Sequence, residues 1–354
     1  MAGYTYAINV LFKEPSRECA IGLRTSKYPY CGNKTDSFNF KDNGFSIEAI
    51  RSSAYKDGDI LSNNRNTLYG QIIKGLLVYY GLSKIFPQIE TVQIKRKKKA
   101  ERYFEYTETQ SFRQPICIKN QRKYSLDLSI VDSILEESEK GNAIRIALTY
   151  WLRAVSSDKT NHIFKFDRLW RSLDRLLLYQ GNTGKENDGI IAIKQLLLSN
   201  SGSFPLSIQI TNTYGENDIR GFSWNMLFSK CSMSYTKTIE LKRRFLEYSD
   251  YRIIKLFKGI CANNKISIAL NRAGLLTDVQ NHFNVHSSTK SDVELVLLFA
   301  LSYTYYIRCR LFHGEVPDSM FKIKDNNEDK EIQKLTELLE VVVYELLNNC
   351  SILR

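Results

Sequence analysis

The chain has 354 residues, and its 50 Lys and Arg outnumber its 38 Asp and Glu, which gives a formal net charge of +12. The hydrophobic content of 43% and the aromatic content of 12% exclude a mainly disordered chain and suffice for about two domains. The longest uncharged apolar stretch, Leu295–Ile307, has 13 residues, fewer than the roughly 20 that cross a bilayer, and no secretory signal is visible. We therefore expect a cytoplasmic protein with no membrane partner, and the charge favours a polyanionic partner.

The first third of the chain has a mixed pattern. Tyr4–Phe12 is rich in aromatic and β-branched residues and predicts a strand, whereas Thr67–Phe86 has the apolar spacing of a helix. Tyr28–Asn43 contains Gly, Asn, Asp and Ser and predicts a loop. Further short strands are predicted at Glu90–Lys95, Tyr103–Thr109 and Pro115–Lys119.

The remainder of the chain has helical periodicity almost throughout. Gly181 and Gly314 each follow a periodic segment and are the expected helix stops. Helices are predicted at Leu128–Glu139, Ala143–Val155, Ile163–Gln180, Ile190–Leu198, Trp224–Phe228, Thr238–Leu246, Tyr251–Ile260, Ile266–Leu275, Ser291–Phe312 and Glu328–Asn349.

The charge is distributed unevenly along the chain. Residues 1–127 hold 21 Lys and Arg against 12 Asp and Glu, so that +9 of the net charge of +12 lies there. We therefore expect an α+β protein, in which a small, basic, mixed α/β domain (1–127) precedes an all-α helical bundle (128–354). The basic domain is expected to bind RNA or to act as a sensor.

Metal and cofactor sites are not expected. The seven cysteines form no Cys-x-x-Cys pair, which disfavours structural zinc and a disulfide framework. His282 and His286 are four residues apart, but Phe283 stands where a metalloprotease needs Glu, and we expect a loop there. Gly181–Glu186 lacks the spacing of a phosphate-binding loop and is expected to be a loop after a helix.

The segment Arg308–Glu315 (RCRLFHGE) offers the clearest chemistry, at the end of a hydrophobic helix. Arginine grips phosphate with a fixed set of donors, and histidine exchanges protons near neutral pH. Together Arg308 and His313 suit metal-independent cleavage of an RNA phosphodiester by the ribose 2′-hydroxyl. Two alternatives remain: solvated charges beside a polar helix end, and a thiol nucleophile formed by Cys309 with His313.

The same segment resembles the Arg-Asn-x-Leu-Phe-His-Gly motif of the Apea-like branch of the HEPN superfamily, and Phe166–Leu176 is similar to that family's first long helix. The resemblance covers roughly residues 140–350. It implies a helical bundle that forms a homodimer, and a ribonuclease of a toxin or antiphage system in which Arg308 and His313 are the catalytic pair. It also implies supporting roles for Cys309, Arg310 and Asp174. Cys309 departs from the Asn, Asp or His common in active members, and Asp174 stands where Glu is frequent.

A second candidate site joins a basic run to aromatic residues. Lysine and arginine here would contact phosphates while aromatic rings stack on bases, and the alternative is a solvated hairpin with its aromatic face in the core. The residues concerned are Lys95, Arg96, Lys97, Lys98, Lys99, Arg102 and Tyr103, followed by Phe104 and Tyr106.

These observations predict an endoribonuclease that needs no cofactor, with RNA as its partner and an antitoxin or defence protein as a further one. The altered motif at Cys309 leaves a second hypothesis open, a catalytically inactive HEPN module that binds RNA or a regulatory protein. A third is that residues 1–127 sense a signal and gate the helical domain.

Overall fold

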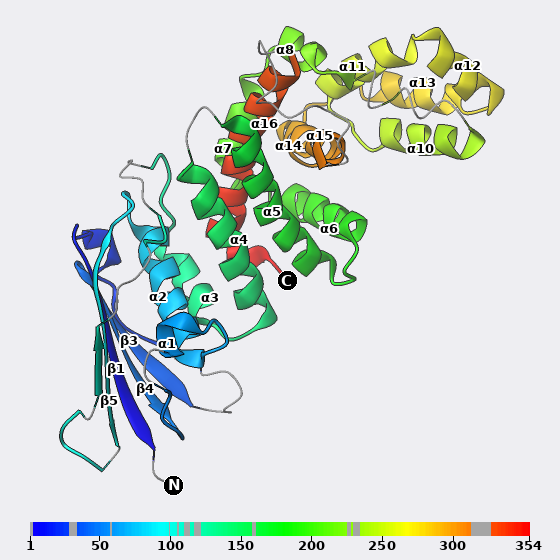
Figure 1. The fold of residues 1–354 in the computed structure, drawn as a ribbon. Helices are drawn as coiled ribbons and strands as arrows, with labels where there is room; N and C mark the ends of the chain where they lie inside the picture. The colour runs from blue at the N-terminus through cyan, green and yellow to red at the C-terminus, as the bar shows by residue number, and fades with distance from the viewer. Residues whose placement is uncertain are drawn as a thin grey trace. The chain divides into compact units, whose positions relative to one another are not determined.

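The computed structural model describes residues 3–27, 34–56, 59–98, 100–104, 106–109, 114–116, 122–157, 161–224, 228, 234–312 and 327–354 (Figure 1). It has the expected α+β class, with an antiparallel sheet followed by helices. The chain divides into two compact units, Met1–Gly189 with Leu346–Arg354, and Ile190–Glu345. Secondary structure does change near residue 127, but the compact division falls later, because the helices that follow residue 127 pack with the sheet domain.

Six strands form the sheet of the first unit, in the order β2-β3-β4-β1-β5-β6, and every neighbouring pair is antiparallel. Their bounds are β1 (Tyr4–Phe12), β2 (Gly22–Lys27), β3 (Thr35–Lys41), β4 (Gly44–Arg51), β5 (Ile89–Lys98) and β6 (Tyr106–Thr109). Alternate residues of β1, among them Tyr6, Ile8 and Val10, are fully buried, while the residues between them face the other side.

Helices α1 (Asp59–Ser62) and α2 (Thr67–Leu82) belong to the same unit, and α2 contacts β4. The Asn66 side chain accepts a hydrogen bond from the Leu68 amide and begins α2 as an N-cap. Close packing of α2 on the sheet requires glycine at position 75, since a Cβ there would lie 2.3 Å from the Phe45 ring.

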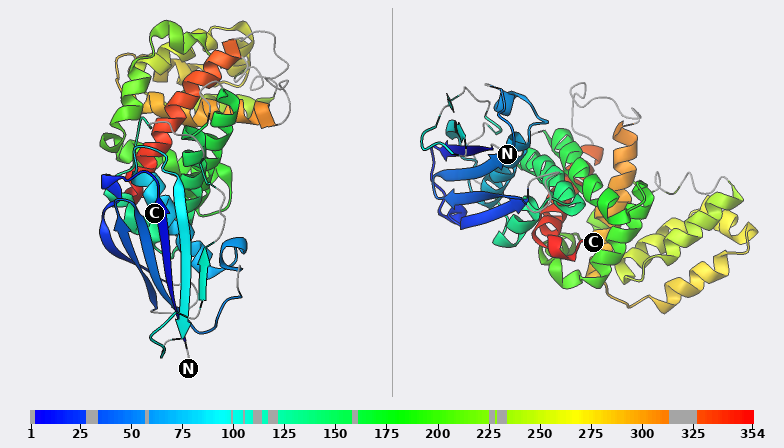
Figure 2. Two further views of the ribbon diagram at one scale, coloured as in Figure 1. Left: turned by 60° about the vertical axis from the view of Figure 1, so that its left-hand side comes forward. Right: turned by 90° about the horizontal axis from the view of Figure 1, so that it is seen from below.

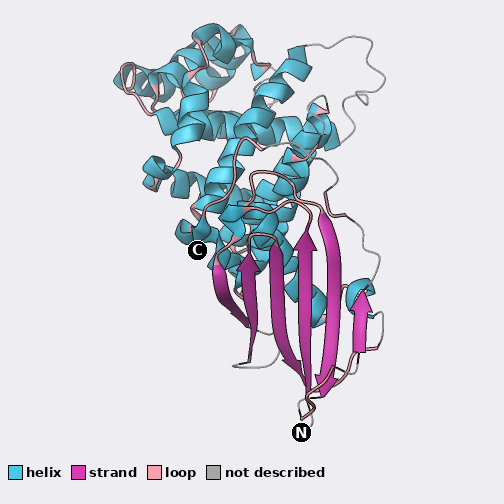
Figure 3. Cartoon of the chain, turned by 90° about the vertical axis from the view of Figure 1, so that its left-hand side faces the viewer, coloured by secondary structure: helices cyan, strands magenta, loops and turns pink. Residues whose placement is uncertain are grey.

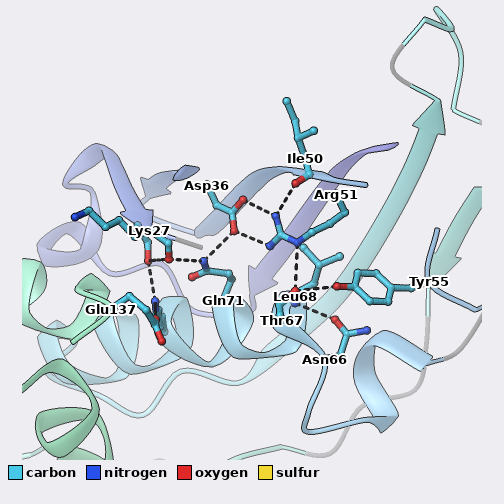
Figure 4. A network of polar contacts seen from close by, with 12 residues as sticks. Lys27, Asp36, Ile50, Arg51, Tyr55, Asn66, Thr67, Leu68, Gln71 and Glu137 are labelled. Carbon is cyan, nitrogen blue, oxygen red and sulfur yellow. Dashed lines mark hydrogen bonds and ion pairs between the residues drawn. The ribbon is translucent and has the colours of Figure 1, made fainter. Parts of the chain in front are cut away.

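A buried polar network joins α2 to the strands (Figure 4). Arg51 donates two hydrogen bonds of 2.7 Å to the Asp36 carboxylate, and Gln71 donates a third of 2.8 Å. Nearby, the Lys74 ammonium donates to Ser26 Oγ at 2.8 Å and to Glu137 at 2.6 Å, and burial lowers the pKa of Lys74. The acidic and basic members neutralise one another in a closed interior, which is the pattern of a structural network.

The remaining helices of the first unit are α3 (Val131–Leu135), α4 (Glu139–Val155) and α5 (His162–Gly181). The α4–α5 pair buries Trp151 and Trp170, and Ser172 Oγ donates a 2.7 Å hydrogen bond to the Ala147 carbonyl across it. Residues 346–354 return to this unit, where the Asn348 side chain accepts from the Asp127 amide.

The second unit contains most of the remaining helices, and the division between the units falls within α6 and α16. In both views of Figure 2, α10 to α13 gather in one group, and they contact one another. The bounds are α6 (Glu186–Ser199), α7 (Pro205–Asn212), α8 (Glu216–Gly221), α10 (Tyr235–Leu246), α11 (Tyr251–Cys261), α12 (Asn264–Arg272), α13 (Leu276–Val285), α14 (Asp292–Val296), α15 (Thr304–Phe312) and α16 (Asn327–Asn348), with a π-helical segment, η5 (Leu297–Tyr303), between α14 and α15.

Several predicted elements are confirmed, among them the strand Tyr4–Phe12 and the helices that became α2, α4, α5, α11 and α16. The loop predicted at Tyr28–Asn43 is wrong for residues 35–41, which form β3. The helix predicted at Leu128–Glu139 is wrong in extent, because a 3-10 turn and α3 end at Leu135. Gly181 is the last residue of α5, and Asn182 instead takes the left-handed conformation after it.

Other predictions extend beyond the described residues. The predicted strand at Tyr103–Thr109 is observed only over β6, the predicted strand at Pro115–Lys119 lies mostly outside the described residues, and so does the helix predicted at Trp224–Phe228. Gly314 also lies outside them. Within the part of the chain that the structure describes, no helix combines the length and apolar character that crossing a membrane requires.

Candidate active site

The helix that carries the Arg308 motif is a continuous path through α14, η5 and α15 in the second unit. Its residues 293–301, together with Tyr303, Thr304 and Ile307, are buried, and Glu294 is the one charged residue among them. The π-helical turn is closed by Thr304, whose Oγ1 donates a 2.8 Å hydrogen bond to the Phe299 carbonyl five residues earlier. Such turns recur at functional sites, since they rotate the residues that follow.

The start of this helix is held by reciprocal carboxylate bonds. Glu294 accepts from the Ser249 and Asp250 amides at 2.6 and 2.8 Å, and Asp250 accepts from the Ser291 amide at 2.7 Å. Asp250 is fully buried and also pairs with Arg252 at 2.8 Å. These contacts fix α14 against the beginning of α11 and so limit how α15 can move.

Arg308, Cys309 and Arg310 lie in the last turns of α15, and all three are half-buried. His313, the predicted partner of Arg308, lies outside the described residues. The arrangement of Arg308 and His313 as a pair therefore stays a prediction, as does the predicted role of Cys309 beside them.

Arg310 has a well-defined partner on α16. Its Nη1 donates a 2.8 Å hydrogen bond to Glu328 Oε1, and each of these side chains is 15% exposed. The Arg310 guanidinium also lies 5.9 Å from the centre of the Tyr306 ring. The Glu328 carboxylate neutralises Arg310, so Arg310 is suited to holding α15 against α16.

A second tie between the two helices is a buried cluster of Tyr303, Glu331 and Ser223. Tyr303 donates a 2.6 Å hydrogen bond to Glu331 Oε2, Ser223 Oγ donates one of 2.9 Å to Oε1, and the Ser223 amide donates to the Tyr303 hydroxyl at 2.9 Å. Burial raises the pKa of Glu331 and the pKa of Tyr303 above their ordinary values. Glu328 and Glu331 are one turn apart on α16, so a single helical face supplies both acidic partners.

Sequence reasoning missed Glu331 and Tyr303, which are separated by 27 intervening positions and carry no local motif. The Tyr303 ring belongs to an aromatic cluster around the π-helical turn, in which the centres of the Phe222 and Phe299 rings lie 4.8 Å apart and those of Trp224 and Tyr303 4.7 Å apart. A glutamate within the apolar periodicity of Glu328–Asn349 was the one signal available.

Glu345, a residue of α16, is another buried carboxylate of this unit, and its side chain contacts the start of α7. It accepts hydrogen bonds from the Leu206 and Ser207 amides at 2.7 and 3.0 Å and from the Ser207 hydroxyl. Burial raises the pKa of Glu345, although these bonds favour its charged form. Its position as an acceptor for the first amides of a helix gives it a structural role.

Asp174, the predicted supporting acid, lies half-buried on α5 in the first unit, whereas Arg308 lies in the second. Its supporting role stays a prediction.

The basic run is divided between the two faces of the sheet. Lys95 and Lys97 alternate in β5 with Arg96, which donates a 2.8 Å hydrogen bond to the Tyr55 carbonyl and lies 5.6 Å from the Tyr4 ring. Lys98 lies 3.4 Å from Glu101, and Lys99 lies outside the described residues. Arg96 thus contacts Tyr4 and Tyr55, and the described residues of the run do not all share one face of the sheet, while their binding of nucleic acid stays a prediction.

The aromatic residues after the run face solvent. Tyr103 is 84% exposed and Phe104 40%, and Arg102 is exposed as well. The alternative of a buried aromatic face is therefore wrong for these two rings, while the side chain of Tyr106 lies outside the described residues. The Lys97 ammonium lies 5.4 Å from the Phe104 ring.

His282 lies in helix α13 and His286 directly follows its last residue, so the loop expected there is wrong for His282. His282 Nε2 lies 2.8 Å from the Tyr248 carbonyl, and His286 Nδ1 lies 3.3 Å from Thr289 Oγ1. Among the described residues, no three His, Cys, Asp or Glu side chains cluster as metal ligands would. The pair is accounted for by these bonds to protein oxygens.

No protein-family model, curated protein or solved structure matches this chain.

Proposed function

We propose that the chain is a metal-independent endoribonuclease whose reacting groups are Arg308 and His313. The observation that carries the proposal is the Arg-x4-His sequence at the end of α15, on a helix anchored to α16 by the Arg310–Glu328 pair. Arg308 is half-buried one turn before the end of this helix, and its guanidinium would grip the phosphate with a fixed set of donors.

In the proposed reaction the ribose 2′-oxygen attacks the adjacent phosphorus, and the bond from phosphorus to the 5′-oxygen breaks. His313 takes the proton from the 2′-hydroxyl or gives one to the departing 5′-oxygen. Arg308 stabilises the charge that develops on the non-bridging oxygens. The products are a 2′,3′-cyclic phosphate and a 5′-hydroxyl. One proton leaves the 2′-hydroxyl and one arrives on the 5′-oxygen, the transfer that His313 does not make passes through water, and no co-reactant is consumed.

Two copies of the chain are proposed to meet through the helical region, so that two Arg308–His313 pairs face one shared cleft. The biological setting we propose is a cytoplasmic toxin or antiphage nuclease, held in check by a partner protein. Both proposals rest on the HEPN resemblance of the motif.

The chemistry is tested by the ends of the cleaved RNA. We expect products with 2′,3′-cyclic phosphate and 5′-hydroxyl ends. We expect no cleavage when the same sequence is made with 2′-deoxyribose throughout. Products with a 5′-phosphate, or equal cleavage of the deoxy substrate, would refute attack by the 2′-hydroxyl.

The second candidate function is a catalytically inactive module that binds RNA or a regulatory protein. Cys309 favours it, because the resembling HEPN motif has Asn at this position. A thiol cannot supply the hydrogen-bond donor and acceptor of an asparagine amide. This candidate predicts salt-sensitive RNA binding without cleavage products. Expression that halts cell growth, and is harmless after His313→Ala, would favour the nuclease instead.

A further inference from the structure

The sheet has one face against α2 and an opposite face that Figure 3 shows with no described element lying across it. On β1, the residues between the buried ones are Thr5, Ala7, Asn9 and Leu11, and none of them is buried. They belong to the face that we name the open face. It comprises the corresponding alternate residues of all the strands.

Strand register places short polar side chains in a row across this face. One row runs through Leu23, Asn39, Ser46, Asn9 and Gln93, which are direct cross-strand neighbours from β2 to β5. The next row runs through Thr25, Ser37, Glu48, Ala7 and Lys95. Four amide or hydroxyl side chains in the first row provide donors and acceptors that neighbouring strands hold about 4.8 Å apart.

Four lysines lie on the open face, against one acidic residue, Glu48. They are Lys27, Lys41, Lys95 and Lys97. Among the described residues, their cross-strand neighbours carry no charge: Thr35 for Lys27, Gly44 for Lys41, Ala7 and Thr107 for Lys95, and Thr5 for Lys97. In the described parts of the chain none of the four has an ion-pair partner.

A cationic pair on another element of the same unit is neutralised locally. On α5, Arg168 and Arg171 share the Asp167 carboxylate at 3.7 and 3.0 Å. Antiparallel strands ordinarily offset exposed lysines with acidic cross-strand neighbours, which stabilise the pair. On the open face that compensation is missing, so the positive charge is available to a partner.

We propose that the open face binds the sugar-phosphate backbone of RNA, an inference that rests on the proposed ribonuclease function and locates its substrate-holding surface. Four inter-strand spacings, about 19 Å in all, separate the lysines of β2 from those of β5. This width is enough to contact several nucleotides. The lysine ammonium groups pair with phosphates. The row of amide and hydroxyl side chains forms hydrogen bonds with phosphate oxygens and ribose hydroxyls. The described strands present no aromatic ring on this face, so contacts to the backbone, with little sequence preference, are expected.

An anionic membrane surface is the competing partner for a lysine face. The exposed aliphatic residues here, Leu11, Leu23 and Ile50, lie on three different strands and make no continuous apolar patch that could enter a bilayer. The row of amide and hydroxyl side chains further favours RNA.

The test compares two full-length variants, each with four Lys→Gln changes, in a His313→Ala background that keeps the RNA intact. One carries the changes at Lys27, Lys41, Lys95 and Lys97; the control carries them at the exposed Lys185, Lys237, Lys258 and Lys265. Binding of a labelled 20-nucleotide RNA of mixed sequence is measured over a salt series. We expect the open-face variant to lose at least tenfold in affinity and about three units of log–log salt slope, whereas the control changes less than twofold.

Equal RNA affinities for the two variants would overturn the proposal. So would a protein that binds vesicles of anionic lipid but does not bind RNA. All four open-face lysines are solvent-accessible, and thermal unfolding of each variant shows whether it is folded; the single changes Lys27→Gln and Lys41→Gln repeat the test with less perturbation. Cleavage is assayed separately on the chain with His313 intact. If binding depends on the open face while no cleavage occurs, the surface stands and the nuclease proposal falls.

Discussion

Arg310 and Glu328 form a 2.8 Å ion pair between α15 and α16, with each side chain only 15% exposed. This pair lies two residues from Arg308 and uses the motif's second arginine for structure. Its role in holding two helices together could not be told from the sequence, in which the two arginines look equivalent.

Breaking the pair is expected to destabilise the chain. Arg310→Ala and Glu328→Ala should each lower the free energy of unfolding by about 2 kcal/mol, because each leaves a mostly buried charge without this partner. The double variant should cost less than the sum of the two. Urea unfolding of all four chains measures the coupling, and strict additivity would show that the pair contributes nothing.

Glu331 predicts a pH dependence whose direction follows from burial. Burial raises the folded-state pKa of Glu331 above its unfolded value of about 4.3. Below that unfolded value the carboxyl is protonated in both states and carries no penalty. As the pH rises through the folded-state pKa, the unfolded chain binds fewer protons than the folded chain, so the free energy of unfolding falls.

Glu331→Gln cannot ionise and keeps an acceptor for the Tyr303 hydroxyl. The free energy of unfolding of the wild type should therefore fall relative to that of this variant as the pH rises from about 4 to about 8. Urea titrations across that range provide the measurement. A difference that is constant, or that moves in favour of the wild type, is incompatible with a raised Glu331 pKa.

Gly75 and Gly70 provide a matched pair on α2. Gly75→Ala should destabilise the chain by about 1–3 kcal/mol, since the new Cβ would lie 2.3 Å from the Phe45 ring. Gly70→Ala has no atom within 4 Å of the new Cβ and should stabilise it by about 0.5–1 kcal/mol. Chemical denaturation of both variants tests the packing of α2 on the sheet. Equal changes in the free energy of unfolding would contradict close packing at Gly75.

Cys309 should limit the proposed cleavage. Cys309→Asn restores the amide of the resembling motif, and we expect an increase in the cleavage rate of about tenfold, the value of roughly one hydrogen bond. Cys309→Ser serves as the control for size. The role assigned to this position is wrong if asparagine leaves the rate unchanged or lowers it.

The sequence predicts the fold best where one pattern dominates. β1 follows from a run of aromatic and β-branched residues, and α2 follows from helical spacing of apolar residues. β3 could not be predicted because Asp36, Ser37 and Asn39 read as loop residues, and Asp36 is tolerated inside only through Arg51 and Gln71, which come from distant segments.

The candidate site divides in the same way. Arg308, Cys309 and Arg310 are found from a local motif, whereas the Arg310–Glu328 and Tyr303–Glu331 contacts depend on how α15 and α16 pack. The basic run was read as one patch, but strand alternation sends Lys95 and Lys97 to one face and leaves Arg96 bonded to Tyr55. Its charged neighbours on the open face come from β2 and β3, which local sequence does not reveal.

The central claim is that Arg308 and His313 cleave RNA without a metal ion. The most direct measurement is the cleavage rate of a mixed RNA in excess chelator by the wild type, Arg308→Ala and His313→Ala, with Arg220→Ala as a control for an exposed arginine of the same unit. We expect the wild type and Arg220→Ala to cleave at similar rates and each motif variant to lose at least about a hundredfold. Cleavage that survives both motif substitutions, or that stops with chelator, would contradict the assignment.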